Sequence, residues 1–202
     1  MFSLYYKQND SYEIEGTCYP VDASFDNILK LIDMTRDKSL MPEYRVLLGI
    51  RMLFGKDTDL VNAYSFKDLN EIFLDIFKIY VNQGKEPEVK KDLAGNPLPP
   101  EYQKDKESCY SLKHDAEYIF ASFMQAYGID LVEEQGKLHW FKFQALLAGL
   151  PEDTKFRQVV SIRLWKKPSK SDTEESQMRE LQEIYKLPDG ESEVEEWVMD
   201  VL

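Results

Sequence analysis

Apolar residues recur at helical spacing along most of this 202-residue chain, and that period limits the fold more than any other feature. In 25–32, directly after Ser24, apolar side chains fall at i, i+3, i+4 and i+7, and the Ser24 hydroxyl can cap such a helix. A broader apolar face runs through 66–80, after Ser65. Because each such segment buries one face against the others, we expect a mainly α-helical fold, built as a helical bundle.

Two N-terminal segments depart from this amphipathic pattern. Residues 12–21 (YEIEGTCYPV) alternate in polarity and carry Gly16 near the middle, which predicts a short N-terminal β-hairpin. Residues 44–54 (YRVLLGIRMLF) are apolar nearly all round. Helices with so little polar surface are usually central, so we expect 44–54 to form a buried helix.

The helical pattern is interrupted at 84–108 and then resumes. Residues 84–108 contain four prolines and almost no large apolar residue, which predicts a mobile loop or tether. Helical periodicity returns in 112–127, 138–149 and 154–164. We expect 112–166 to be the most strongly specified part of the fold.

Charge is distributed unevenly, and the last 32 residues hold most of the formal net charge of −12. Residues 171–202 contain 11 acidic and 2 basic residues, a net charge of −9. Met178, Leu181 and Tyr185 share one face of a helix in this part of the chain. We therefore expect a helical domain over 1–170 and an acidic helical tail over 171–202.

A basic run precedes the acidic tail. Residues 155–170 (KFRQVVSIRLWKKPSK) contain six Lys or Arg and no acid, and Arg163, Lys167 and Lys170 recur at helical spacing. Such a run suits a nucleic-acid or phosphate patch, a charge-complementary protein contact, or a solvated helix end. Because the acidic tail would cover or neutralise it, within the chain or between chains, we take Arg163 and Lys167 as candidate protein-binding residues.

A narrow apolar stripe lies at the end of the sequence. Ser192 and Glu195 form a capping-box pattern at its start. The stripe consists of residues at i, i+3, i+4 and i+7, namely Val194, Trp197, Val198 and Val201. A short helix that exposed this apolar stripe would tend to associate with other apolar surfaces. We therefore expect it to pack on its own domain, on a neighbouring copy or in a partner's groove. We predict that these four residues bind protein, with Trp197 as the anchor.

The sequence contains none of the common catalytic, cofactor or metal motifs. Its two histidines, His114 and His139, have no partner at i+4 and no Cys/His cluster near them. The nine glycines form no phosphate-binding loop and no nucleophile elbow. We therefore expect no enzyme activity, cofactor or metal ion, and we expect His139 to lie beside Trp140 at the edge of the core.

Composition also limits the partners and the compartment. The net charge of −12 disfavours general binding to nucleic acid or to an anionic membrane. No apolar window approaches 18 residues, and the N-terminus does not have the pattern of a signal peptide. Cys18 and Cys109 are far apart and too few for a disulfide scaffold, so we expect reduced thiols in a cytoplasmic protein.

Residues 115–163 carry a clustered set of short motifs: AEYIFASF, AYGIDL, LHWFKF, ALLAGLP and a closing IR. In this order they resemble the most distinctive region of a siphophage protein family. That family is encoded between the tail-tube and tape-measure genes in phages and prophages of Gram-positive bacteria. The N-terminal half is similar to the family more loosely, and the tail after Ser171 is not matched.

The resemblance implies a tail-assembly chaperone in the host bacterial cytoplasm. Such proteins are small, helical and prone to form oligomers, and they bind the tape-measure protein and the tail-tube protein. The family offers no catalytic residues to transfer to this chain. The alternative is a structural virion component, such as a connector or tail-terminator subunit.

Overall fold

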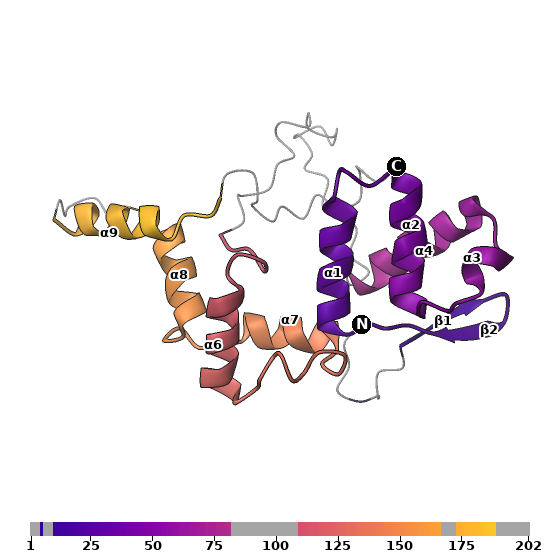
Figure 1. Ribbon diagram of the computed structural model, residues 1–202. Helices are drawn as coiled ribbons and strands as arrows, with labels where there is room; N and C mark the ends of the chain where they lie inside the picture. The colour runs from indigo at the N-terminus through magenta and orange to yellow at the C-terminus, as the bar shows by residue number, and fades with distance from the viewer. Residues whose placement is uncertain (1–4, 6–9, 82–108, 167–172, 189–202) are drawn as a thin grey trace, which may run out of the picture. The chain divides into compact units, whose positions relative to one another are not determined.

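The computed structural model describes residues 5, 10–81, 109–166 and 173–188 (Figure 1). The described chain is mainly α-helical with one two-stranded antiparallel sheet, which confirms the predicted fold class and its N-terminal hairpin. The predicted loop at 84–108 and much of the predicted tail lie outside the described residues. The predicted domain boundary between residues 170 and 171 therefore stays a prediction.

The chain divides into two compact units, and neither unit is a single continuous stretch of sequence. Among the described residues, unit 1 contains 5, 10–81 and 132–145. Unit 2 contains 109–131, 146–166 and 173–188. Within the parts of the chain that the structure describes, no helix is both long enough and apolar enough to cross a membrane.

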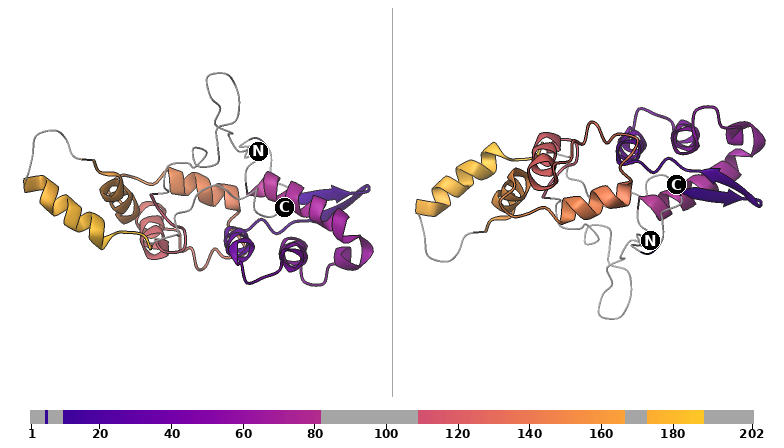
Figure 2. Two further views of the ribbon diagram at one scale, coloured as in Figure 1. Left: turned by 90° about the horizontal axis from the view of Figure 1, so that it is seen from above. Right: turned by 90° about the horizontal axis from the view of Figure 1, so that it is seen from below.

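The hairpin of unit 1 pairs β1 (Ser11–Ile14) with β2 (Thr17–Pro20). Glu15 and Gly16 form its turn, both with positive φ, as a type I′ hairpin turn requires. The hydroxyl of Tyr12 donates to Asp75 of the helix α4 (Phe66–Tyr80) at 2.6 Å. The two strands accordingly lie beside α4 in both views of Figure 2.

The helices of unit 1 are α1 (Phe25–Arg36), α2 (Pro42–Phe54), α3 (Leu60–Ala63), α4 (Phe66–Tyr80) and the first six residues of α7 (Trp140–Ala148). Helix α4 begins with a capping box: the Ser65 hydroxyl accepts from the Asp68 N–H, and the Asp68 carboxylate accepts from the Ser65 N–H. Ser24 also occupies an N-cap position, but its hydroxyl donates to Asp22 and makes no cap bond to α1.

The sequence led us to expect that α2 is buried on all sides, but one side of this helix is exposed. Its Val46, Gly49, Ile50 and Leu53 are buried in unit 1, whereas Tyr44 is 59% exposed. Helices α1, α3 and α4 contact α2, whereas Tyr44 and Leu48 on its other side are exposed. Because both sides are apolar, the hydrophobic pattern alone did not show which one is covered.

Gly49 allows α2 and α4 to approach closely. A Cβ atom added at Gly49 would lie 2.9 Å from Cδ2 of the Phe73 ring and closer still to Cε2. Phe73 is almost completely buried, so its ring has little room to move. The missing side chain at position 49 therefore sets the distance between these two helices.

The start of α1 is joined to the segment before α7 by backbone and side-chain bonds. The Phe25 N–H donates to Leu138 O, and the Trp140 N–H donates to Ala23 O, both at 2.9 Å. The Asp26 carboxylate accepts from the Gly136 N–H at 2.8 Å. These bonds hold residues that are more than 100 positions apart in the sequence within one unit.

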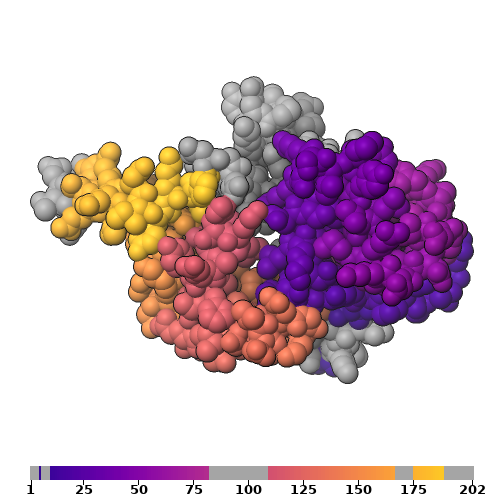
Figure 3. All heavy atoms as spheres, in the orientation of Figure 1, coloured from indigo at the N-terminus to yellow at the C-terminus, as the bar shows by residue number. Residues whose placement is uncertain are grey.

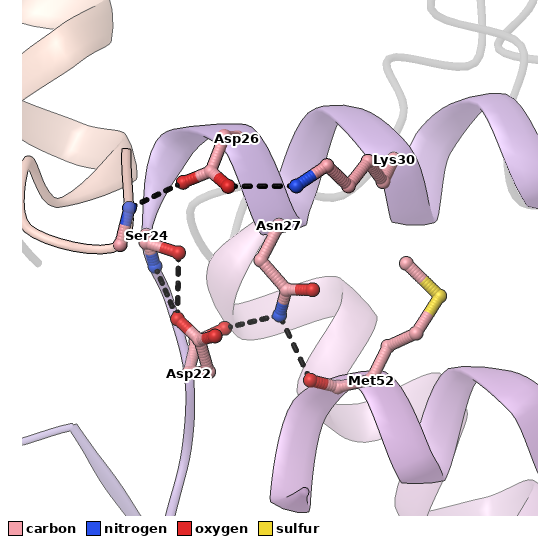
Figure 4. A network of polar contacts seen from close by, with 7 residues as sticks. Asp22, Ser24, Asp26, Asn27, Lys30 and Met52 are labelled. Carbon is pink, nitrogen blue, oxygen red and sulfur yellow. Dashed lines mark hydrogen bonds and ion pairs between the residues drawn. The ribbon is translucent and has the colours of Figure 1, made fainter. Parts of the chain in front are cut away.

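The Asp26 and Asn27 side chains complete this junction. Burial alone would raise the pKa of Asp26, but its bonds to Lys30 and to the Gly136 N–H outweigh burial and lower that pKa. The Asn27 amide donates to Asp22 O and to Met52 O, which links the start of α1 to the end of α2 (Figure 4).

Unit 2 is built from α6 (Ala116–Tyr127), the end of α7, α8 (Lys155–Leu164) and α9 (Thr173–Ile184). The Ser122 hydroxyl joins α6 to α8, because it accepts from the Phe156 N–H at 3.0 Å and donates to Tyr118 O at 2.6 Å. Gly128 ends α6 in the left-handed conformation, as predicted. Helix α6 begins at Ala116, so the predicted start at residue 112 is four residues early.

Helix α9 lies in the first part of the predicted acidic tail. The predicted face of Met178, Leu181 and Tyr185 is its half-buried side. This face packs on α8 within unit 2.

Gly49→Ala should destabilise the protein, although Gly→Ala normally stabilises a helix interior by about 1 kcal/mol. The added methyl group overlaps the Phe73 ring, so we expect a net loss of about 1–3 kcal/mol in the free energy of unfolding. Urea denaturation measures this loss. Gly49→Ala should cost less in a Phe73→Leu background than in the wild type, since leucine leaves more room for the methyl group. A rise in stability for Gly49→Ala alone would contradict this packing.

Candidate protein-binding surfaces

Of the six residues predicted to bind protein, Arg163 is the one within the described residues. The other five, Lys167, Val194, Trp197, Val198 and Val201, lie outside them. Their role in binding stays a prediction.

Arg163 lies in the last turn of α8 and makes a two-pronged ion pair with Asp115. Its Nη1 and Nη2 donate to the two carboxylate oxygens at 2.6 and 2.8 Å. Nη1 also donates to Cys109 O at 3.1 Å, and Nε donates to Tyr185 O at 2.6 Å. The Arg163 and Asp115 side chains are 11% and 1% exposed.

The position of Asp115 suits a negative charge. It is the N-cap residue of α6, where the helix dipole favours an anion, and its carboxylate also accepts from the Ser111 N–H at 2.9 Å. The Arg163 guanidinium is therefore directed into unit 2, where it joins α6, α8 and the end of α9. Partner binding through Arg163 stays a prediction, and it would have to use this side chain without breaking the ion pair.

The tail helix α9 and the residue after it contact part of the basic run through Gln182 and Tyr185, two side chains without a formal charge. The Gln182 amide donates to Ile162 O and to Trp165 O, both at 3.0 Å, carbonyl groups near the end of α8. Lys155 Nζ donates to the Tyr185 hydroxyl at 2.6 Å and lies 4.6 Å from the centre of that ring. Polar and aromatic groups of the tail make these contacts.

A surface hollow of about 240 Å³ opens beside the ion pair. Its lining includes Asp115, Arg163 and the rings of Tyr118 and Tyr185, and the exposed His114 also borders it. Because Asp115 and Arg163 already satisfy each other, this ion pair does not offer the hollow a free charge for a ligand.

His139 is a structural histidine at the start of α7. Its Nδ1 accepts from the Phe141 N–H at 3.0 Å, so its Nε2 carries the proton that faces Asp10 Oδ1, also at 3.0 Å. The ring is buried, with its centre 4.9 Å from that of Phe141 and 6.5 Å from that of Tyr80. Burial lowers the His139 pKa, and Asp10 offsets only part of this effect.

Trp140, which follows His139, is buried and its ring stacks on that of Phe143. His139 therefore lies beside the buried Trp140, as we expected. Within the described residues, no three His, Cys, Asp or Glu side chains are grouped so that they could hold a metal ion. The thiols of Cys18 and Cys109 are both free.

The outward side of α2 is an exposed apolar surface that we did not predict from the sequence. It consists of Met41, Tyr44, Leu48 and Met52, and we name it the α2 outer face. Met41, Tyr44 and Leu48 are 60%, 59% and 38% exposed, and Met52 is half-buried. Residues of α1 and α2 form the near surface of unit 1 in Figure 3, where they are indigo to purple.

Two arginines border the α2 outer face. At 100° per residue, Arg45 and Arg51 fall on opposite sides of the line through Tyr44 and Leu48, and Glu43 falls farther round the helix. The sequence did contain a signal for this face. Residues 44–54 hold more apolar residues than one buried side of a helix can accommodate, so some of them had to face outward.

Arg163→Met should destabilise unit 2, because it leaves the buried Asp115 carboxylate without its counter-charge. We expect a loss of about 3–5 kcal/mol in the free energy of unfolding, measured by urea denaturation. Arg179→Met is the matched control, since Arg179 is exposed and pairs with Glu175 on the same helix. The control should lose less than about 1 kcal/mol. Equal losses in the two variants would show that the ion pair does not stabilise the fold.

His139→Asn should make the protein less sensitive to acid. Because the folded-state pKa of His139 is lowered, the unfolded chain binds the proton more tightly, and stability falls as the pH falls below about 6.5. Asparagine still caps α7 but cannot take up this proton. The wild type should therefore lose more unfolding free energy than the variant between pH 7.5 and pH 5.5. An identical loss in both would refute the assigned role of His139.

Comparison with known proteins places the chain in a family. Neither the curated proteins nor the solved structures contain a significant match to it. Residues 7–187 match the family model described as Bacteriophage Gp15 protein. This match includes both units and the helix α9. The chain therefore belongs to the Bacteriophage Gp15 protein family, a family of phage proteins.

Proposed function

We propose that this protein is a phage tail-assembly chaperone that binds the tape-measure and tail-tube proteins in the host bacterial cytoplasm. Membership of the Bacteriophage Gp15 protein family supports a role in a phage. The resemblance of 115–163 to a family encoded between the tail-tube and tape-measure genes supports the specific step.

The α2 outer face is the observation that carries the proposal. An unassembled tape-measure protein exposes long amphipathic helices that would associate with one another. An exposed apolar stripe on a helix suits such a partner, because helices dock through residues spaced at i, i+3 and i+7. Met41, Tyr44 and Leu48 have this spacing and are exposed. A stripe of this size binds weakly enough for tube subunits to displace it.

Charge supports the same role. A net charge of −12 keeps the protein soluble and would keep a complex with an apolar partner in solution. The arginines beside the α2 outer face would favour helices whose flanks are acidic. The protein as a whole is negatively charged, but the arginines beside the α2 outer face are positive, and this local positive charge would select the partner.

The proposed role is not catalytic. Both nitrogens of His139 take part in bonds that hold unit 1, and the charges of Arg163 and Asp115 pair inside unit 2. These polar groups stabilise the fold, which supports a protein that acts through its surface.

Co-expression with the tape-measure protein tests the proposal. The wild type should co-purify with that protein and increase its soluble fraction. Tyr44→Glu should reduce both effects by about tenfold, because it places a charge in the apolar contact. Phe66→Glu is the matched control: Phe66 is 45% exposed, and glutamate is tolerated in the first turn of α4. If the wild type neither co-purifies with the tape-measure protein nor improves its solubility, the proposal fails.

Mass spectrometry of purified phage particles separates the proposal from the alternative, a structural virion component such as a connector or tail-terminator subunit. An assembly chaperone should be absent from finished particles. The presence of this chain in fixed, stoichiometric amounts would favour the structural alternative.

A further inference from the structure

The α2 outer face is long enough to hold another helix. It extends from Met41 to Met52, about 16 Å along α2, which corresponds to about three helical turns. Met41, Tyr44 and Leu48 are exposed along it. An apolar stripe alone does not distinguish one amphipathic helix from another, so selectivity has to come from the charged groups beside it.

Two arginines beside this stripe have no carboxylate partner in the described parts of the chain. Arg45 is half-buried, and its Nε atom is covered by the protein without a hydrogen-bond partner. Arg51 is exposed and forms no hydrogen bond or ion pair with a described residue. By contrast, Arg163 and Arg179 each pair with a carboxylate. The chain has 37 acidic residues, yet both charges beside the stripe are left for a partner.

The acidic residues closest in sequence do not neutralise these arginines. The Asp37 carboxylate accepts from the hydroxyl and the N–H of Ser39, at 2.6 and 2.9 Å. These bonds hold the pKa of Asp37 below its usual value, and the Arg45 charge adds a smaller contribution. Glu43 falls farther round α2 than either arginine. The two sides of the stripe therefore keep a positive charge.

We infer that Arg45 and Arg51 determine which helix the α2 outer face binds, namely an amphipathic helix of another protein with carboxylates on both sides of its apolar stripe. The inference rests on the proposed function in taking this face as the binding surface, and it adds the chemistry of the partner. The two arginines are six positions apart, about 9 Å along α2, and lie on opposite sides of the stripe. A docked helix therefore meets one guanidinium group on each side, where carboxylates form charge-assisted bonds and lysines are repelled.

A second copy of this chain is a poorer occupant. A two-fold interface uses the same surface patch of both copies, so pairing through the α2 outer face would bring two copies of Arg45 and two of Arg51 together. Four arginines would then surround one apolar contact. Like charges at an interface oppose association, so the charges favour a different protein with acidic flanks.

Two synthetic peptides test the inference without the tape-measure protein. Each has three heptads with leucine at positions a and d, and positions e and g are all glutamate in one peptide and all lysine in the other. Both residues are good helix formers, and like charges at e and g keep each peptide from pairing with itself. At low salt the wild type should bind the glutamate peptide about tenfold more tightly, measured by fluorescence anisotropy. The overall charge of −12 alone would produce the opposite preference.

Charge reversal shows whether the arginines cause this preference. Arg45→Glu/Arg51→Glu should bind the lysine peptide more tightly than the glutamate peptide. Lys67→Glu/Lys166→Glu is the matched control, because it changes the net charge equally at two exposed residues outside α2, and it should keep the preference of the wild type. Circular dichroism checks the helix content of both variants. The wild type alone provides a second measurement, since about 1 M salt should remove most of its preference.

Several results would overturn the inference. The wild type could bind the two peptides equally, prefer the lysine peptide or bind neither, or its preference could persist at high salt. The arginine variant could keep the preference, or the control could lose it as well. Sedimentation could also reveal a dimer of the chain that Tyr44→Glu abolishes, because a second copy would then occupy the face. Failure of the proposed function is a separate result, namely that the chain does not co-purify with the tape-measure protein, whatever the peptides do.

Discussion

The contact between Gly49 and the Phe73 ring decides which side of α2 faces the core. Since α2 is apolar on both sides, the close approach at position 49 selects the side that packs on α4. The opposite side, with Met41, Tyr44 and Leu48, is then left to solvent. The surface that we propose for partner binding is therefore a consequence of how unit 1 packs.

Polar side chains of both units are used to stabilise the fold. In unit 2 the Arg163 guanidinium pairs with Asp115 and holds the end of α9 through Tyr185 O. In unit 1 the His139 ring caps α7 and bonds to Asp10. These polar interactions join segments that are distant in sequence, and the apolar α2 outer face is left exposed.

The spacing of apolar residues along the sequence predicted the helices, the hairpin and the half-buried face of α9, because these features depend on residues that are close in the sequence. It was wrong about α2, since a helix with two apolar sides does not show which one the fold covers. The sequence also gave no sign that Arg163 would pair with Asp115, 48 positions away, or His139 with Asp10, 129 positions away. Such contacts depend on the tertiary fold and lie beyond local spacing.

Hydroxyl-radical footprinting measures directly whether the tape-measure protein covers the α2 outer face, because methionine and tyrosine oxidise readily when exposed. The protein is labelled with and without the tape-measure protein. We expect Met41 and Tyr44 to be protected from oxidation in the complex, because the partner covers them, and Phe66 to react equally in both samples. Unchanged oxidation of Met41 and Tyr44 in a complex that has formed would contradict it.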